Sequence, residues 1–463
     1  MKSVAIIGAG ITGLTAAYYL RRAGVAVSIF ESSNRVGGAI RSTRREGYLA
    51  ESGPNTILET SPIITQLIHD LGLESRRIIP DPKMKTRFLV RDRKMIPVPS
   101  SPFQSLSTKL FSLKAKLAIL REPFVSKCSK GKEESIADFV LRRLGSEFLD
   151  YAIDPMVGGI YAGDPSKLSV KHAFPKLMNL ESEYGSLIMG AVLGASKRRK
   201  SKEVAKDRAQ AFSFDEGLDV LPKKLAEVLG DAIQLNASIQ KISRTQNGWK
   251  LEILNGKEKT SVEFDAVIYA GSAFKLPMLC VETEEGRLNL DAFSEIRHPP
   301  VSSVVLGYRR EDVTHSCMGF GVLVPKVENF NILGTIFSSS LFSNRAPEGG
   351  ITLTSYLGGE RDHDLASLSS EELFEITHRD LSVLLGIKGE PIFRHHSYYP
   401  EAIPQYNLGY DRFHNLMEKI EKKAPNFYFA GTYRDGISLG DAILSGRRIA
   451  AHLEQSITSN FTA

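Results

Sequence analysis

The 463-residue sequence predicts an α/β plus α+β protein, in which a discontinuous Rossmann-type domain is combined with a helical insertion and an α+β domain. Three observations predict this fold class. A strand, a glycine turn and a helix open the chain, a second glycine turn and helix close it, and amphipathic helices fill much of the middle. A chain of this length also exceeds what one hydrophobic core usually holds.

The first element is a βαβ unit. Residues 4–7 form an apolar strand, the glycine pattern GAGITG follows, and an amphipathic helix leads to a second strand that ends at Glu31. Gly8 permits a tight turn, Gly10 lets backbone N–H groups approach a pyrophosphate, and Gly13 lets the helix pack against the strand. Glu31 can accept hydrogen bonds from a ribose hydroxyl, which favours a dinucleotide without a 2′-phosphate.

The segment after this acid continues the same site. Arg35 can bind a pyrophosphate bidentately, and the pair Gly37-Gly38 lets a ligand lie against the backbone. Asn55 follows Gly53-Pro54, where it either points its amide at a ligand or stabilises a turn, and both interpretations stay open. A helix is expected to begin at Ser61-Pro62.

Residues 97–130 alternate apolar residues with lysines and contain no acid before Glu122. This pattern predicts either an interfacial helix lying on a membrane or a core helix with a basic solvated face. The basic run at 196–208 is expected to be a solvated loop. Without a secretory signal or a long apolar stretch, we expect a cytoplasmic protein, peripheral on the cytoplasmic face of the membrane.

The middle of the chain predicts helices joined by a glycine-rich loop. Ser135 is the expected N-cap of an amphipathic helix, and the chain is expected to break at the glycines of GGIYAGDPSKLS, residues 158–169. It then turns at Asp164-Pro165 and restarts, with Ser169 capping a helix toward Leu180. No apolar strand precedes these glycines, so a phosphate-binding loop is disfavoured.

The end of the chain, like its beginning, contains a strand, a glycine turn and a helix in succession. Residues 427–430 read as a strand, Gly431 and Gly436 as turns, and residues 439–452 as a helix. Alternating strands near residues 237–264 and a short apolar strand within 265–273 lie between the two ends of the chain. We expect both ends to meet one dinucleotide at the carboxyl ends of a parallel sheet.

These motifs resemble the amine-oxidase-like FAD flavoproteins, which share the first glycine motif, RVGG and the closing glycine turn and helix. The middle resembles the oxygen-dependent protoporphyrinogen oxidases more specifically, through LGSE, GIYAGDPSKLS, GSLIMG, GFGVLVP, LGTIFSSSLFSNRAPEG, YLGGERD and IPQYNLGY. The resemblance implies FAD, bound without a covalent link because GTYRDGIS contains no cysteine. It also implies oxidation of a porphyrinogen by dioxygen in three two-electron steps, with hydrogen peroxide as a product.

The resemblance also implies a set of site residues. The implied FAD contacts are Gly8, Gly10, Ile11, Thr12, Gly13, Glu31, Ser32, Arg35, Gly38, Ala39, Gly53, Pro54, Asn55, Thr56, Ile239, Tyr410, Gly431, Ile437, Ser438 and Leu439. Asn55 is the implied catalytic residue. Arg87 matches a propionate-binding arginine, with a solvated strand-edge arginine as the alternative, and Tyr356 stands where the family has a stacking phenylalanine. Gly159 and Gly163 are expected to shape the wall of the substrate cavity.

The expected organisation has a FAD domain at 1–85, 205–285 and 420–463, a helical insertion at 86–204 and a substrate domain at 286–419. No metal site is expected, because the three cysteines show no ligand spacing and the histidines are read as surface or packing residues. The excess of 59 basic over 53 acidic residues is too dispersed for nucleic acid. Expected partners are a porphyrinogen, dioxygen, a membrane surface, a second copy of the chain and a ferrochelatase.

Other functions compete with protoporphyrinogen oxidation. Coproporphyrinogen III has four propionates rather than two, and its oxidation would call for more cations at the pocket edge. Amine oxidation or carotenoid desaturation is a more distant alternative within the same superfamily. A flavin-binding protein without oxidase activity is the non-enzymatic alternative.

Overall fold

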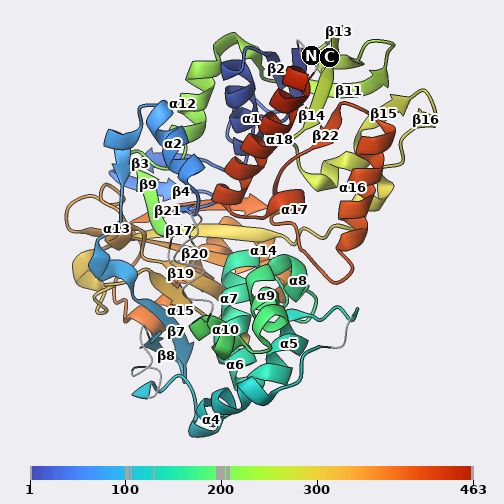
Figure 1. Ribbon diagram of the computed structural model, residues 1–463. Helices are drawn as coiled ribbons and strands as arrows, with labels where there is room; N and C mark the ends of the chain where they lie inside the picture. Colours follow the sequence, from blue (N-terminus) through green and yellow to red (C-terminus); the bar gives the residue numbers. More distant parts are fainter. Residues whose placement is uncertain are drawn as a thin grey trace.

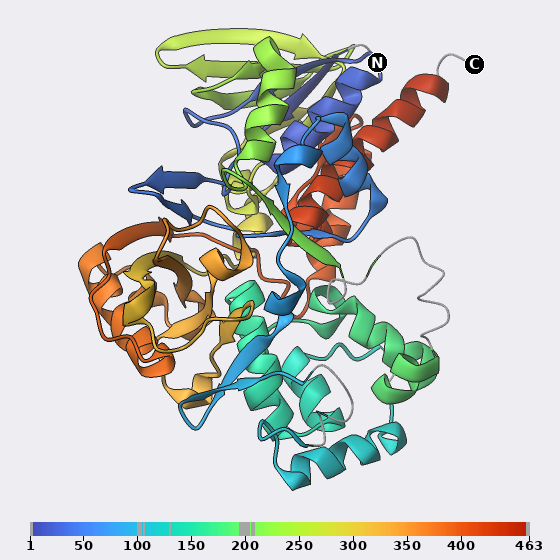
Figure 2. The ribbon, with the colours of Figure 1, turned by 90° about the vertical axis from the view of Figure 1, so that its left-hand side faces the viewer.

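The computed structural model describes residues 3–99, 104, 107–128, 131–193, 204 and 209–459. An α/β domain lies at the top of the molecule, a seven-stranded sheet in the middle and a cluster of helices at the base (Figure 1). The second view separates the sheet and the helical cluster into two lobes beneath the α/β domain (Figure 2). The basic run at 196–208 lies outside the described residues, except for residue 204.

The α/β domain is built on a parallel sheet of order β10-β2-β1-β14-β22. Its strands come from three separate stretches of the chain: β1 Ser3–Ile7, β2 Ala26–Phe30, β10 Ile233–Gln234, β14 Ala266–Tyr269 and β22 Phe427–Phe429. All four residues of β14 are buried, as expected for an interior strand of a parallel sheet covered by helices. The predicted convergence of the two chain ends on one sheet is confirmed.

Helices α1 (Ile11–Arg22) and α18 (Leu439–Ser459) lie side by side beside this sheet (Figures 1 and 2), near α12 (Val220–Leu229). A Cβ on Gly446 of α18 would lie 2.4 Å from the Thr12 carbonyl oxygen, so the two helices approach backbone to backbone. This close packing fixes the amino end of one helix relative to the other.

A second sheet, of order β13-β12-β11-β15-β16, continues the α/β domain. Its strands are β11 Ala237–Arg244, β12 Trp249–Asn255, β13 Glu258–Phe264, β15 Cys280–Thr283 and β16 Gly286–Arg287. The predicted alternation is confirmed in β12, where buried and exposed residues alternate from Trp249 to Ile253. Trp249 is fully buried and packs against Phe427 of β22, which joins the two sheets.

The seven-stranded sheet has the order β21-β17-β20-β19-β18-β7-β8. Its strands are β7 Arg87–Arg91, β8 Lys94–Pro97, β17 Val301–Arg309, β18 Gly321–Leu323, β19 Ile332–Ile336, β20 Gly350–Gly358 and β21 Phe393–Tyr399. Helices α14 (His363–Ala366) and α15 (Ser370–Leu385) pack against it, and α15 begins with a capping box of Ser369 and Glu372. The division into five segments stays a prediction, except that β7 and β8 belong to this sheet and not to the helical insertion.

The helical cluster contains α4 Leu113–Arg121, α5 Ile136–Arg143, α6 Ser146–Phe148, α7 Asp154–Tyr161, α8 Val170–Ala173, α9 Pro175–Tyr184 and α10 Leu187–Leu193. The predicted N-cap is confirmed, since the Ser135 hydroxyl accepts a hydrogen bond from the Asp138 N–H at 3.0 Å. Arg143 is 2% exposed and binds Glu122 and Glu181, so a compensated buried charge ties three helical segments together. Among the described residues, none of the helices combines the length and the apolar character needed to cross a bilayer.

The predicted break at the glycines of GGIYAGDPSKLS is wrong. Helix α7 runs through Gly158 and Gly159 and ends at Tyr161, where Ala162 turns into the left-handed region at φ 48°. A Cβ on Gly159 would lie 2.4 Å from Cδ2 of Leu323, so these glycines bring the helix close to the sheet. Tertiary packing therefore outweighs the poor helix propensity of glycine.

Ser169 occupies the predicted N-cap position of α8, but its hydroxyl donates a hydrogen bond to Glu133 at 2.5 Å and accepts none from a backbone N–H of the helix. The helix expected toward Leu180 is divided into α8 and α9 at Pro175, which follows a non-helical Phe174.

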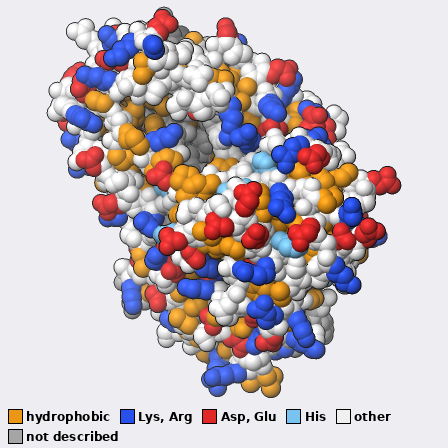
Figure 3. Space-filling model, turned by 180° about the vertical axis from the view of Figure 1, so that it is seen from behind, with side chains coloured by type: hydrophobic (Ala, Val, Ile, Leu, Met, Phe, Trp, Pro, Cys, Tyr) orange, Lys and Arg blue, Asp and Glu red, His pale blue; other side chains and the backbone are white. Residues whose placement is uncertain are grey.

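Further strands and helices pack around these sheets or form two small sheets of their own. These are β3 Ser42–Arg45, β4 Tyr48–Glu51, β5 Ile57–Glu59, β6 Arg77–Ile78, β9 Gln210–Phe214, α2 Pro62–Asp70, α13 Ser338–Leu341, α16 Asp411–Lys423 and α17 Thr432–Asp435. The predicted start of α2 is confirmed, with Ser61 as its N-cap. Seen from behind, the surface is hollowed in its upper half, and acidic and basic side chains are mixed over it (Figure 3).

Candidate functional site

The amino end of α1 forms a cradle bounded by backbone. Gly8 has φ 104°, and a Cβ on Gly13 would lie 2.1 Å from the Gly8 carbonyl oxygen. A Cβ on Gly10, in contrast, would meet no atom within 4 Å and would project into open space. The first N–H groups of a helix have no intrahelical partner. Space, unpaired donors and the helix dipole together fit a pyrophosphate.

Glu31 lies at the carboxyl end of β2, where the backbone holds it in place. Its carboxylate accepts hydrogen bonds from the Ala9 N–H at 2.9 Å and the Ser33 N–H at 2.8 Å. A carboxylate has about four lone-pair sites, so acceptor capacity remains for a ribose hydroxyl. The Glu31 carbonyl accepts from the Ala237 N–H at 2.9 Å, which brings β11 and the half-buried Ile239 beside this end of the site.

Arg35 organises the loop that follows. Its guanidinium donates to the carbonyl oxygens of Val36, Gly38 and Ile40 at 2.6–3.1 Å. These bonds hold Gly38 against the α1 cradle. A Cβ placed on Gly38 would lie 3.4 Å from the Gly10 Cα. The geometry gives Arg35 a positioning role in its loop, and its contact with a pyrophosphate stays a prediction, since the guanidinium has five N–H donors.

The second turn brings Asn55 and Tyr356 together. The Asn55 Nδ2 donates to the Tyr356 hydroxyl at 2.5 Å and to the Gly53 carbonyl at 3.4 Å, and the same hydroxyl donates to the Gly53 carbonyl at 3.0 Å. Asn55 thus both stabilises its turn and contacts strand β20 of the seven-stranded sheet. Burial raises the pKa of Tyr356 well above its ordinary value, so the phenol stays a neutral donor. Gly53 itself lies against Ala39, where a Cβ would be 2.5 Å from the carbonyl oxygen.

The closing motif presents a second helix amino end. The Ser438 N–H donates to the Asp441 carboxylate at 3.1 Å and the Asp441 N–H donates to the Ser438 hydroxyl at 3.2 Å, so α18 begins with a reciprocal cap. The Gly431 N–H donates to the Ser445 hydroxyl at 2.9 Å, which ties the glycine turn to the same helix. The predicted turn and helix are confirmed, with the Ile437 backbone between the two glycine turns and α18.

Tyr410 is buried, and its contact with FAD stays a prediction. It is 1% exposed, and its hydroxyl donates to the Tyr433 carbonyl at 2.6 Å, so its ring supports the closing motif from the core. The neighbouring Tyr406 was missed, although its hydroxyl accepts from the Gly436 N–H at 2.8 Å. The IPQYNLGY motif contains both tyrosines, and their hydrogen-bond partners lie in a distant segment of the chain.

An apolar cluster lies beside Tyr356. Ala162, Val301 and Leu333 form a buried cluster against which Tyr356 packs. Gly163 adjoins this cluster, and a Cβ there would lie 2.4 Å from Oε1 of Gln405. Ala162, between Gly159 and Gly163, therefore brings this segment to the cluster beside Tyr356, and the role of the two glycines in a substrate wall stays a prediction.

Arg87 is the first residue of β7 and is exposed, with its guanidinium 5.3 Å from the centre of the Phe320 ring. Arg87 lies on the same face of the sheet as Tyr356. Strand pairing leads from Arg87 through Gly321 and Ile336 to Thr354, and residues two apart on a strand share a face. Three strand spacings, roughly 14 Å, separate Arg87 from Thr354, and Tyr356 lies two residues further along β20. Arg87 forms no ion pair with any described residue, so its charge is available to an anionic ligand.

Glu51 is a buried acid that the sequence did not single out. It is 2% exposed, accepts hydrogen bonds from the Ser42 hydroxyl at 2.6 Å and the Leu218 N–H at 2.8 Å, and lies 3.8 Å from Arg345. Burial raises its pKa to about 7. The signal that could have revealed it is an acid that ends the otherwise apolar strand YLAE, two residues before Gly53.

The chain is similar to flavoproteins along nearly its whole length. A family described as flavin containing amine oxidoreductase matches residues 11–453. Protoporphyrinogen oxidase 2 of Arabidopsis thaliana is 36% identical over 97% of this chain and 93% of its own. Coproporphyrinogen III oxidase of Bacillus subtilis (strain 168) is 29% identical over 96% of each chain.

The fold agrees with this similarity. A solved structure from Exiguobacterium sp. 255-15 superposes with a TM-score of 0.81 at 23% identity, covering 98% of this chain and 99% of the other. The cofactor is FAD, for which the cradle at α1, Glu31 and the amino end of α18 provide a fitting set of groups. The chain belongs to the flavin-containing amine oxidoreductases and, among them, to the protoporphyrinogen oxidase family.

Proposed function

We propose that the protein oxidises protoporphyrinogen IX to protoporphyrin IX in tetrapyrrole biosynthesis, with dioxygen as the acceptor and hydrogen peroxide as a product. The contact between Asn55 and Tyr356 carries this proposal, because it joins the FAD-binding turn to the wall of the substrate sheet. Bound FAD supplies the hydride acceptor. The protein's own task is to hold the macrocycle against it and to exclude water.

The apolar cluster, Tyr356, Arg87 and Asn55 each have a distinct role in this proposal. The apolar cluster at Ala162, Val301 and Leu333 provides a wall for a wide apolar macrocycle, and Tyr356 adds a ring that stays neutral. Arg87 binds a propionate at the edge of the sheet. Because Nδ2 of Asn55 is already bonded, the amide oxygen is the atom that this side chain presents to the substrate.

Coproporphyrinogen III is the alternative substrate, and Arg361, one candidate cation for its additional propionates, is already paired. Four propionates would call for several uncompensated cations. Arg361 lies beside Gly158 of α7, but it is paired with Asp154 at 3.1 Å and donates to the Val324 carbonyl. The charge of Arg361 is therefore already compensated, which favours the substrate with fewer carboxylates.

A parallel assay with the two porphyrinogens tests the proposed substrate. Purified FAD-loaded protein is given protoporphyrinogen IX or coproporphyrinogen III in air, and porphyrin fluorescence and hydrogen peroxide are followed. We expect a higher kcat/KM for protoporphyrinogen IX, with one peroxide per two-electron step. Fluorescence growth with coproporphyrinogen III alone would contradict the proposal, and turnover of amines without either porphyrinogen would favour amine oxidation.

We also propose that the protein attaches peripherally to a membrane through α4, on the cytoplasmic face. Leu113, Leu117 and Leu120 are 74%, 52% and 69% exposed, and Phe124 just after the helix is 89% exposed. The spacing of the three leucines places them on one side of the helix, and α4 lies at the base of the molecule (Figure 1). The alternative of a core helix leaves these four side chains unexplained, whereas an interfacial helix buries them in lipid.

Vesicle binding tests this attachment. Replacing both Leu117 and Leu120 with serine is expected to lower partitioning into anionic vesicles about 100-fold, since each buried leucine contributes about 1.5 kcal/mol. Activity on detergent-solubilised substrate should stay unchanged. Met278 is a matched control, because it is 76% exposed but lies in the α/β domain. Equal vesicle binding by the double variant, the Met278→Ser variant and the unchanged protein would contradict this role of α4.

A further inference from the structure

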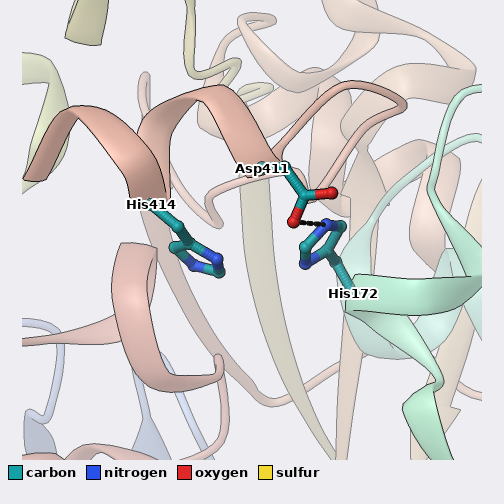
Figure 4. A group of neighbouring side chains, drawn as sticks. All are labelled: His172, Asp411 and His414. Atoms are coloured by element: carbon teal, nitrogen blue, oxygen red, sulfur yellow. Dashed lines mark ion pairs between the residues drawn. The ribbon is translucent and has the colours of Figure 1, made fainter. Parts of the chain in front are cut away.

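Three side chains meet where the helical insertion touches α16. His172 comes from α8, while Asp411 and His414 occupy the first turn of α16 (Figure 4). Their donor atoms all lie within 4.8 Å of one another, and Nε2 of His172 is 3.2 Å from Oδ1 of Asp411. None of the three groups has a role in the flavin site described above.

Both imidazoles have a buried nitrogen without a hydrogen bond. Nε2 of His172 and Nε2 of His414 are buried and lack a hydrogen-bond partner among the described residues, because the contact of His172 with Asp411 is close but does not have hydrogen-bond geometry. The His172 side chain is 8% exposed. A buried polar atom left unpaired costs about 1–3 kcal/mol. Such an atom therefore points to a ligand that would satisfy it.

We propose that His172, Asp411 and His414 bind a divalent transition-metal ion of the zinc class. Two donors on a tetrahedral ion with bonds of 2.0–2.1 Å lie roughly 3.3 Å apart, close to the 3.2 Å between His172 and Asp411. Two imidazoles on one such ion have ring centres about 5 Å apart, and those of His172 and His414 are 5.3 Å apart at 70°. All the donor atoms lie within 4.8 Å of one another, so binding would draw the His414 donor toward the other two.

The surroundings complete the coordination shell. The Asp411 side chain is 50% exposed, so water can reach a fourth position. Its Oδ2 binds Lys171, which leaves Oδ1 for the metal and holds the carboxylate in place. Lys171 also opposes the ion electrostatically, but it is 44% exposed and this repulsion is screened by solvent.

The site would connect the helical insertion to the flavin-binding end of the chain. The Tyr410 ring lies 5.8 Å from the ring of His172 and 5.3 Å from that of His414, and its hydroxyl binds the Tyr433 carbonyl. Metal binding would therefore stabilise both α8 and the closing motif. Sequence spacing could not reveal the site, because His172 lies far along the chain from the pair on α16.

Metal titration of the FAD-loaded, untagged protein tests this proposal. After treatment with a chelator, the protein is titrated with Co²⁺ as a spectroscopic probe, and Zn²⁺ is used to displace it. We expect one equivalent to bind, with the intense visible absorption of four-coordinate Co²⁺ and a rise in Tm with Zn²⁺. His172→Gln, His414→Gln and Asp411→Asn should each lower the affinity at least about tenfold. His363→Gln alters a histidine that is 41% exposed and is the matched control.

The milder variant keeps the test decisive. Asp411→Asn changes a half-exposed carboxylate and is expected to fold and retain FAD, which the flavin absorbance verifies. The proposal fails if Zn²⁺ does not bind at micromolar concentration, or if Asp411→Asn and His414→Gln bind it as well as the His363→Gln control. Porphyrinogen oxidation is assayed separately, so failure of the metal site and failure of the proposed function give different results.

Discussion

Replacing Gly13 with alanine is expected to abolish FAD retention and to lower the free energy of unfolding by about 3 kcal/mol. The new Cβ would lie 2.1 Å from the Gly8 carbonyl oxygen and 3.3 Å from its carbonyl carbon. Because these are backbone atoms, the clash cannot be relieved by turning a side chain. Helix α1 must move away from β1, and the cradle at its amino end widens. Flavin absorbance after gel filtration and Tm measure the two effects.

Gly10→Ala separates binding from folding. Its Cβ would meet no protein atom within 4 Å, and Gly10 has φ −69°, which alanine adopts without strain. The FAD-free variant should therefore be as stable as the FAD-free parent. Its methyl group occupies the space assigned to the pyrophosphate, so FAD affinity should fall at least tenfold, or about 1.4 kcal/mol. Unchanged FAD affinity in Gly10→Ala would show that the pyrophosphate lies elsewhere.

This contrast shows why the FAD end of the molecule could be predicted. The requirements at Gly8, Gly13 and Glu31 arise within one βαβ unit, where short-range geometry fixes what each residue meets. The closing motif was predictable for the same reason, since its turn and helix are local. The role of Arg35 could not be predicted from the sequence, because a guanidinium that can bind a pyrophosphate can equally bind three carbonyl oxygens of its own loop.

The arrangement of α7 and of the seven-stranded sheet could not be predicted in this way, because it depends on contacts between segments that are distant in the sequence. The continuation of α7 through Gly158 and Gly159 follows from packing against Leu323 and Arg361, which no local pattern displays. The β7–β8 hairpin joins β18 by parallel pairing, so its membership of the sheet is likewise a long-range property. Resemblance found these residues, but only the structure showed what each of them contacts.

Asn55→Ala is expected to lower kcat for porphyrinogen oxidation about 100-fold while FAD remains bound. A small misplacement of the substrate costs about this much when no other group orients the reacting carbon. Tyr356→Phe removes the hydroxyl that accepts from Asn55 and donates to the Gly53 carbonyl, so the amide loses its position. A buried hydrogen bond contributes about 1–1.5 kcal/mol, so this variant should lose about tenfold in kcat. Steady-state kinetics with protoporphyrinogen IX measure both.

The two changes should not be additive, since the proposed role of the Tyr356 hydroxyl is exerted through Asn55. In the Asn55→Ala background, Tyr356→Phe should therefore have little further effect on kcat. Tyr399→Phe is a matched control, because that hydroxyl makes only a 3.4 Å contact with the Ala39 carbonyl and should change kcat less than twofold. Independent, multiplying losses in the double variant would show that Tyr356 acts on the substrate directly, and full activity of Asn55→Ala would remove Asn55 from the catalytic site.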